Sequence, residues 1–441
     1  MERWDEFTIQ TLSAGLWPVE RLGNVLLPRK DMVDRKISEF NTLQPISIHF
    51  DGSVSKRVVA EGISYKLKML RAEPGDIVLS KIDLKNGALT VLPDWPNAVV
   101  TTHFKVYEAH SERLFARFLQ RLMQTKPIKT WLWQNRSGAD GRTEVKIEVF
   151  ENLAIPLPPL LEQQCLITAL EAAQQSATDL QRRATTLRAD AQTAFEAALG
   201  FAPELSLPKR PVFVARYAQL ERWSHEGLLR AERGAQRDSS SFWPLLPAAN
   251  FVTEARHGCS AGPAKIETGL KVLKISAVTK GRLRLSEYKP IEDRAGYRAD
   301  FGLKAGDVLL CRTNGTLAYV GMTAHVSDDV ADTIIPDKII RVRLDGSMID
   351  AWYFAEVLKT PRLRASIEAA ARTAVGNFAI GAKDIRALMI PLPPLSTQRD
   401  LVQALQAARD QADALSAQAA TLLSQAAEAF EQAVFGVSNS P

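Results

Sequence analysis

Apolar residues are most regular in two segments of the chain, residues 161–198 and 396–433. In both, leucine and alanine recur at alternating spacings of four and three residues, the heptad pattern of helices that pack side by side. The first seam consists of Leu166, Leu170, Ala173, Ala177, Leu180, Ala184, Leu187, Ala191, Ala194 and Ala198. The second consists of Leu401, Leu405, Ala408, Ala412, Leu415, Ala419, Leu422, Ala426, Ala429 and Ala433. The pattern predicts two long helices.

The two seams match each other residue for residue. All ten seam pairs are identical, whereas only six of the 28 other aligned positions agree, so identity is concentrated where the helices would touch. Two copies of one self-complementary seam favour pairing about a pseudo-two-fold axis. About 190 intervening residues allow the helices to run antiparallel. In the alternative arrangement, each helix covers its own domain or meets a helix of another protein.

The repeat extends beyond the helices. Glu2-Arg3-Trp4 recurs at Glu221, Trp17-Pro18 at Trp243-Pro244, and Gly75-Asp76 at Gly306-Asp307. The string Ile-Pro-Leu-Pro-Pro-Leu occurs at 155–160 and again at 390–395. Because the order is kept and the offset grows gradually, the second copy is a lengthened version of the first.

The segments before the two helices have a mixed α/β pattern. In the first, 76–80 and 99–106 read as strands and 113–124 as a helix. In the second, 307–311 and 338–344 read as strands, and 351–358 with 361–372 as helices. We interpret each Gly-Asp pair as a tight turn before its strand.

The proline strings predict a stiff connection between a domain and a helix. Three prolines fix φ near −65° and remove three backbone donors, which favours extended backbone. A ligand for an SH3-like or WW-like module is the other reading, but two occurrences directly before a helix favour the joint. Ser396 offers the second helix a side-chain N-cap, which the first helix lacks.

Charge is distributed unevenly along the chain. The net charge is +5, residues 161–200 carry −2 and residues 396–441 carry −3, so the rest of the chain carries +10. Basic domains are a plausible footprint for a polyanion such as DNA. Three cysteines without CxxC spacing, and neither a signal peptide nor an apolar run of about 20 residues, lead us to expect a soluble, cytoplasmic protein.

Motifs for common catalytic chemistry are missing from the sequence. It contains no GxxxxGK[ST] loop, no HExxH or similar metal-binding cluster, and no Asn/Asp-Pro-Pro-Tyr/Phe motif of amino-methyltransferases. Glu144-Val145-Lys146 has the spacing of a nuclease half-site, but Pro93-Asp94 lies too far before it. We therefore expect neither a catalytic residue nor a metal site in this chain.

With two domains, two proline joints, a glutamine in each helix start (Gln163 and Gln398) and two heptad helices, the chain resembles the specificity subunits of type I restriction-modification systems. The resemblance covers essentially the whole length. It implies two target-recognition domains, an antiparallel coiled coil that acts as a ruler, and recognition of a split, asymmetric site in double-stranded DNA. It also implies two methyltransferase subunits that bind S-adenosylmethionine, and restriction/translocase subunits that use ATP and Mg²⁺; this chain itself would hold no cofactor.

We therefore predict an α/β (α+β) architecture with two mixed domains, separated by a pair of antiparallel coiled-coil helices and related by a pseudo-two-fold. The expected segments are a first target-recognition domain at 1–158, a spacer helix at 159–200, a second domain at 201–393, a second helix at 394–436 and a tail at 437–441. The leucines expected to carry the coiled-coil contact are Leu166, Leu170, Leu180, Leu187, Leu401, Leu405, Leu415 and Leu422.

Candidate DNA contacts are basic and amide residues at equivalent irregular places in the two copies. Arginine reads guanine and asparagine reads adenine with two hydrogen bonds each, while lysine more often holds phosphate. In the first copy the candidates are Lys81, Lys85, Asn86, Gln134, Asn135, Arg136 and Arg142. In the second copy they are Arg312, Thr313, Asn314, Arg372 and Asn377.

Two other functions remain open at this point. One is a nuclease or fused restriction enzyme with an unrecognised active site, for which loss of metal-dependent cleavage on Glu144→Ala would be supporting evidence. The other is a coiled-coil scaffold that binds no nucleic acid, which would lack the steep salt dependence of phosphate binding.

Overall fold

The computed structural model describes residues 16–33, 42–58, 68–138, 143–200, 242–260, 262, 269–374 and 376–436. The chain divides into two compact units. The first contains the described residues up to Arg182 together with those from Leu415 onward, and the second runs from Arg183 to Ala414. The repeated Glu-Arg-Trp strings and the tail at 437–441 lie outside the described residues.

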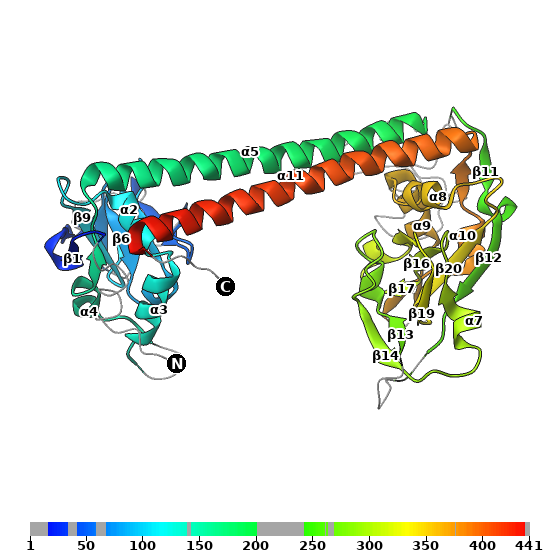
Figure 1. Ribbon diagram of the computed structural model, residues 1–441, viewed down its shortest axis with the longest axis horizontal. Coiled ribbons are helices and arrows are strands. Elements are labelled where there is room, and N and C mark those ends of the chain that lie inside the picture. Colours follow the sequence, from blue (N-terminus) through cyan, green and yellow to red (C-terminus); the bar gives the residue numbers. More distant parts are fainter. Residues whose placement is uncertain are drawn as a thin grey trace. The chain divides into compact units, whose positions relative to one another are not determined.

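The described residues of the first unit form two four-stranded sheets and several short helices. Figure 1 shows α2, α3 and α4 beside strands such as β6 and β9. One sheet has the order β2-β9-β6-β7, the other β4-β3-β8-β5, and β1 pairs with β10. The strands are β1 (Val19–Arg21), β2 (Leu26–Arg29), β3 (Gln44–Ile48), β4 (Val54–Lys56), β5 (Met69–Ala72), β6 (Ile77–Ser80), β7 (Leu89–Val91), β8 (Ala98–Thr101), β9 (Phe104–Ala109) and β10 (Ala154–Pro156). The short helices are α2 (Ala116–Leu122), α3 (Lys126–Gln134) and α4 (Ile147–Glu151).

The second unit repeats this arrangement with the orders β12-β20-β16-β18 and β14-β13-β19-β15, and with the pair β11-β23. Its strands are β11 (Leu245–Pro247), β12 (Val252–His257), β13 (Leu270–Leu273), β14 (Tyr288–Ile291), β15 (Gly302–Leu303), β16 (Val308–Cys311), β18 (Thr323–His325), β19 (Val330–Ile334), β20 (Ile339–Leu344) and β23 (Met389–Pro391). An added sheet contains β17 (Thr313–Asn314), β22 (Asn377–Ala379) and β21 (Arg372–Ala374). The short helices are α7 (Tyr297–Phe301), α8 (Ala351–Val357), α9 (Pro361–Ala370) and α10 (Ala382–Arg386).

The strands that follow the Gly-Asp pairs, β6 and β16, each separate two hydrophobic cores. All four residues of each strand are buried, and successive side chains point to opposite faces. Ile77 and Leu79 face the core formed with the helices, whereas Val78 belongs to the core shared with the other sheet. In β16, Val308 and Leu310 face the core formed with the helices. Leu309 and Cys311 belong to the core shared with the other sheet. An unbroken apolar run in the sequence is thus a strand buried on both faces.

Two long helices account for the heptad segments: α5 (Leu160–Ala198) with 39 residues and α11 (Leu395–Phe435) with 41. In the first unit, Ile167 near the start of α5 and Phe430 near the end of α11 join one core. In the second unit, Phe195 near the end of α5 and Leu405 near the start of α11 join another. These pairings confirm the predicted mixed α/β class with antiparallel long helices.

Burial along the helices follows the seam until its last turns. Leu170, Ala177, Ala184, Leu405, Ala412 and Ala419 are buried, while the other six leucines of the predicted coiled-coil contact are partly buried. Ala194 and Ala429 are exposed, so the predicted seam is wrong at these two positions. Phe195 and Phe430 are buried instead. A straight helix drifts relative to a seven-residue repeat, and the larger rings enter the domain cores at that point.

Several strands and helices have other bounds than the sequence pattern predicted. The predicted strand at 99–106 is two strands in different sheets, β8 and β9, joined by a turn at Thr102 and His103. The helix expected at 113–124 is the shorter α2, and α9 ends at Ala370, so that Arg372 lies in a strand. Ser396 is not an N-cap, because α11 begins at Leu395. Both long helices therefore begin at equivalent positions, the last leucine of each proline string.

Within the described part of the chain, no helix is both long enough and apolar enough to cross a membrane.

The fully buried Ala184 lies on α5 within the second unit. We expect Ala184→Leu to destabilise the chain by about 1–3 kcal/mol, because added methylenes have no space at such a contact. The control is Ala189→Leu on the exposed side of the same helix, which should change stability by about 0.5 kcal/mol or less. Urea unfolding of both variants measures the difference. Equal midpoints would contradict close helix packing at Ala184.

Candidate nucleic-acid interface

The Gly-Asp pairs form the corners from which the candidate loops depart. Gly75 and Gly306 have φ values of +88° and +85°, in the left-handed region that glycine tolerates best. The buried carboxylates of Asp76 and Asp307 accept the backbone N–H groups of Glu73 and Lys304, each at 2.8 Å. The predicted turns are confirmed, and both corners are closed by the same side-chain bond.

An arginine neutralises each buried aspartate, but it comes from a different strand in each copy. Arg29 of β2 lies 2.7 Å from Asp76, and Arg343 of β20 lies 2.9 Å from Asp307. A glutamate on the paired strand completes each group: Glu108 of β9 is 3.6 Å from Arg29, and Glu254 of β12 is 3.1 Å from Arg343. The two copies therefore carry the same cluster with its charges exchanged between strands. Burial raises the pKa of Asp76, although Arg29 opposes this shift.

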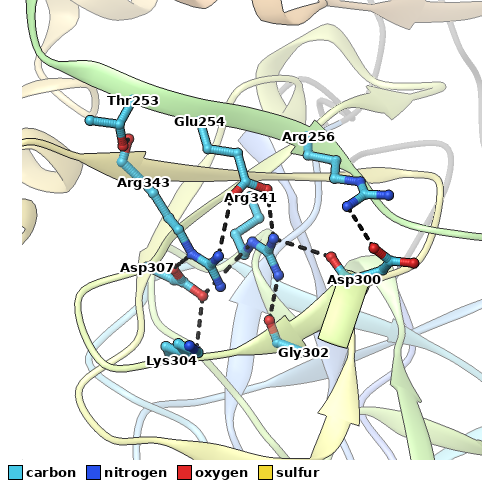
Figure 2. A network of polar contacts seen from close by, with 9 residues as sticks. All are labelled: Thr253, Glu254, Arg256, Asp300, Gly302, Lys304, Asp307, Arg341 and Arg343. Atoms are coloured by element: carbon cyan, nitrogen blue, oxygen red, sulfur yellow. Dashed lines mark hydrogen bonds and ion pairs between the residues drawn. The ribbon is translucent and has the colours of Figure 1, made fainter. Parts of the chain in front are cut away.

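The second copy adds a buried arginine to this cluster (Figure 2). Arg341 is 1% exposed and donates to the Glu254 carboxylate at 2.6 Å, to the Asp300 carbonyl at 3.2 Å and to the Gly302 carbonyl. Asp307 lies 3.9 Å from its Nε atom. A buried guanidinium requires such partners, because desolvation is costly for an unpaired charge. In the first copy the equivalent strand position holds the apolar Val106.

Lys81 and Arg312 follow the two central strands and make the same contacts. The Lys81 backbone N–H bonds to the His103 carbonyl at 3.1 Å, and its Nζ atom donates to the Thr102 carbonyl at 2.8 Å. The Arg312 N–H bonds to the Lys338 carbonyl at 2.8 Å, and its guanidinium donates to the Asp337 carbonyl at 3.0 Å. Both side chains hold the turn that links the two sheets, and both have further donors for a ligand.

In the first unit, two of the predicted regions meet. Lys85 Nζ donates to Thr143 at its carbonyl (2.5 Å) and at its hydroxyl (2.7 Å), which joins the loop after β6 to the segment after α3. Asn86 ends a short 3-10 helix and is partly buried. Gln134 is exposed, and Asn135 donates to the Trp131 carbonyl at 2.9 Å, so it closes the end of α3. Arg142 lies outside the described residues.

In the second unit, the added sheet brings the remaining candidates together. Thr313 and Asn314 form β17, which pairs with β22, and Asn377 begins β22 and pairs with Ala374 at the end of β21. Arg372 begins β21, is 77% exposed and lies 3.8 Å from Asp384. Asn314 accepts the Thr316 N–H at 3.0 Å. Four polar residues from three strands thus share one small sheet.

Sequence reasoning missed an aromatic residue in the first unit, beside the candidate Arg136. Trp133 on α3 is 46% exposed, and the Arg136 guanidinium stacks over its ring at 4.4 Å from the centroid. Arg136 also donates to the Trp133 carbonyl. The aligned residue of the second copy is Glu368 on α9, which lies 3.3 Å from Arg364. Two polar neighbours, Gln134 and Asn135, drew attention to this segment, but nothing in the heptad or strand pattern marked the tryptophan as exposed.

The described residues contain no group of three or more histidine, cysteine, aspartate or glutamate side chains that could hold a metal ion. Cys311 is buried behind Arg312, and burial raises the pKa of its thiol to about 11. The loop residues offer hydrogen-bond donors, amide groups and positive charges. Such groups suit a polyanion whose bases present hydrogen-bonding edges.

Comparison with known proteins agrees with this arrangement. The chain is 24% identical to the Escherichia coli K12 type I restriction enzyme EcoKI specificity subunit over 306 residues, 69% of this chain and 61% of that protein. It is also 24% identical to the Escherichia coli EcoEI specificity subunit over 439 residues, 85% of this chain and 74% of that protein. The match therefore spans less than two thirds of the EcoKI subunit. No family model matches.

Solved structures show the fold. The crystal structure of the HsdS subunit from Thermoanaerobacter tengcongensis superposes with a TM-score of 0.52 at 19% identity, covering 96% of this chain and 97% of that one. This chain has the fold of type I specificity subunits. A chain from a structure of complex assembly and conformational transition in a type I R-M system gives a TM-score of 0.57 at 19% identity, covering 95% and 97%. The resemblance to type I specificity subunits that the sequence indicated is confirmed.

Arg341 gives a test of the network in Figure 2. Arg341→Met should destabilise the chain by about 3 kcal/mol, because removal of one partner leaves carboxylates with less compensation. The control is Arg256→Met. Arg256 pairs with Asp300 at 3.0 Å with both side chains about half exposed, so its loss should cost about 1 kcal/mol or less. Chemical denaturation at pH 7 measures both. A cost for Arg341→Met no greater than that of the control would contradict the network.

The same network predicts a pH dependence. Burial opposes ionisation of Glu254, but the hydrogen bond and charge of Arg341, with the charge of Arg343, outweigh it and hold the pKa of Glu254 below its usual 4.5. A carboxyl group whose pKa is lower in the folded than in the unfolded state stabilises the fold at pH values above its unfolded-state pKa. This contribution is lost as the pH falls through the folded-state pKa. We expect Glu254→Gln to destabilise the chain at pH 7 and progressively less below pH 4.5. A stability difference that stays constant from pH 7 to pH 3 would contradict this assignment.

Proposed function

We propose that this chain is the DNA-reading specificity subunit of a type I restriction-modification complex. Its two domains would each read one half of a split, asymmetric site in double-stranded DNA. The observation that carries the proposal is the repetition of one domain topology, with polar loop residues at equivalent places, in a chain that is similar along most of its length to type I specificity subunits.

The divergence between the copies supports an asymmetric site. The central strands and corners are alike, but the residues that follow them differ: Lys81, Lys85 and Asn86 in one copy correspond to Arg312 and the Thr313-Asn314 strand in the other. Trp133 and Arg136 extend the first surface, and Arg372 with Asn377 extends the second. Different donors meet different base edges, so the half-sites should differ in sequence.

The proposal assigns catalysis and cofactors to partner subunits. Two methyltransferase subunits would bind around this frame and carry S-adenosylmethionine, while restriction and translocase subunits would use ATP and Mg²⁺. The relatives are named as specificity subunits of restriction enzymes, which supports a recognition role within a larger enzyme. No specific observation among the described residues favours the alternative of a nuclease centred on Glu144.

The proposal is tested by reconstitution. The purified chain should transfer no methyl group and cut no DNA by itself, but with its methyltransferase partner it should methylate one split sequence. DNA affinity should fall steeply with salt, because neutralised phosphates release counterions. Methyl transfer by the chain alone, or a complex that methylates no split sequence, would contradict the proposal. Exchange of residues 1–154 with those of a relative should change only one half of the methylated sequence.

Arg372 provides a specific prediction. Arg372→Ala should relax base preference at one position of the second half-site, by about 1–3 kcal/mol, and leave the first half-site unchanged. The matched control is Arg182→Ala on α5, because Arg182 is 75% exposed and pairs with Asp179. Arg372 likewise pairs with an aspartate, Asp384. Methylation of a library with every base varied in turn measures the effect. An equal loss in both half-sites would assign Arg372 to phosphate contact instead.

A further inference from the structure

Each long helix has one fully buried polar residue in its first turn, and it is the same residue in both copies. Gln163 and Gln398 have 0% exposure and occupy the same position relative to the proline string. A buried amide needs partners for its oxygen and for its N–H₂ group. Neither side chain contributes to the seam between the helices or to the candidate DNA contacts, so their identity in the two copies has another cause.

The partners of the two glutamines are equivalent. Gln163 Oε1 accepts the Phe115 N–H at 2.9 Å, and its Nε2 atom donates to the carbonyls of Arg113 (2.8 Å) and Pro158 (2.7 Å). Gln163 thereby joins three segments: the start of α5, the proline string and the loop before α2. No carboxylate or aliphatic side chain of this size can accept one bond and donate two.

Gln398 repeats this pattern in the second unit. Its Oε1 atom accepts the Asp350 N–H at 2.8 Å, and its Nε2 atom donates to the carbonyls of Met348 (3.2 Å) and Pro393 (2.8 Å). These partners again belong to the proline string and to the loop before a domain helix, here α8. Two copies that share only part of their sequence have kept all three contacts.

A tryptophan makes a second contact between each domain and the helix pair. In the first unit, Trp17 Nε1 donates to the Ala433 carbonyl of α11 at 2.7 Å. In the second unit, Trp243 Nε1 donates to the Ala198 carbonyl of α5 at 2.8 Å. The last carbonyls of a helix have no partner within the helix, so an indole N–H can hold them. The repeated Trp-Pro strings thus belong to the attachment of the helices.

We propose that Gln163 and Gln398 are positioning residues that fix the direction in which each helix leaves its domain, and that they thereby set the spacer length accepted between the two half-sites. This inference rests on the proposed function. The prolines restrict the backbone of the joint. The hydrogen bonds of the glutamine amide then hold the joint against the domain backbone. Trp17 and Trp243 hold the neighbouring end of the other helix, so each domain is attached at two points.

Geometry makes the direction of the helix important. At 1.5 Å per residue, the 39 residues of α5 rise about 58 Å. A tilt of about 5° at the first turn displaces the far end sideways by about 5 Å. Loss of the amide contacts therefore changes the direction of the helix and, under the proposed function, the spacer preference with it, whereas a purely stabilising residue would leave the spacer preference unchanged.

The experiment uses the full chain assembled with its methyltransferase subunits. Gln163→Met keeps the length of the side chain but removes its three hydrogen bonds, and the control is Gln164→Met at the exposed neighbouring position. Gln398→Met is compared with Gln403→Met, which is also an exposed position on its helix. Methylation rates are measured on three DNAs that carry the same half-sites with the native spacer, one base pair fewer and one more.

We expect both buried variants to keep the half-site sequences and to lose about tenfold or more of the preference for the native spacer over its neighbours. The two controls should keep the wild-type preference. If the spacer preference stays unchanged while only the unfolding temperature falls, the positioning role is wrong. If the wild-type complex methylates no split site, the proposed function itself fails, which is a different result.

A second variant covers the case in which Gln163→Met does not fold. Trp17→Phe keeps an aromatic ring and removes a single hydrogen bond to the Ala433 carbonyl. It should lower the spacer preference in the same direction. A folded Trp17→Phe complex with the wild-type spacer preference would overturn the proposed attachment in that case.

Discussion

Each unit of this protein has to bury the start of one long helix and the end of the other. In the first unit Ile167 and Phe430 belong to a single core, and in the second Phe195 and Leu405 do. Neither domain core is complete without both helices, which makes the helix pair part of each fold. Each core therefore joins segments that lie far apart in the sequence.

The constraint also explains where the two copies agree. Buried seam positions such as Ala184 and Ala419 admit little change, because a close-packed interior leaves no space for a longer side chain. Gln163 and Gln398 are retained because each serves three backbone groups at once. The polar side chains in segments 81–86 and 312–314, such as Lys85 and Asn314, are only partly buried and are under less packing constraint. The repeat therefore preserves the attachment of the helices and allows the candidate contact surfaces to diverge.

Sequence patterns predicted the elements whose period is long and regular. The seam identified both long helices and their antiparallel pairing, since ten identical residues at heptad spacing are typical of helices that pack against each other. The single strand expected at 99–106 failed because an apolar run has the same appearance whether it stays in one sheet or turns at Thr102 into another. The seam failed at Ala194 because the neighbouring ring of Phe195 buries more apolar surface. Lys81 and Arg312 could be predicted as loop cations, but their bonds to the linking turn depend on a fold that brings distant carbonyls to them.

The exchanged charges around the Gly-Asp corners affect how the two copies can recombine. In one copy the cation comes from β2 and the glutamate from β9, while in the other Glu254 of β12 faces Arg343 of β20. A chain that joined β2 to β20 would have Leu27 at the position of Glu254, so Arg341 and Arg343 would share Asp307 alone. A buried guanidinium that loses a carboxylate partner opposes folding. Exchange at the proline strings, outside the clusters, would keep each set of charged partners together, whereas exchange within a domain would separate them. The corner that closes each domain therefore depends on strands that come from the same copy.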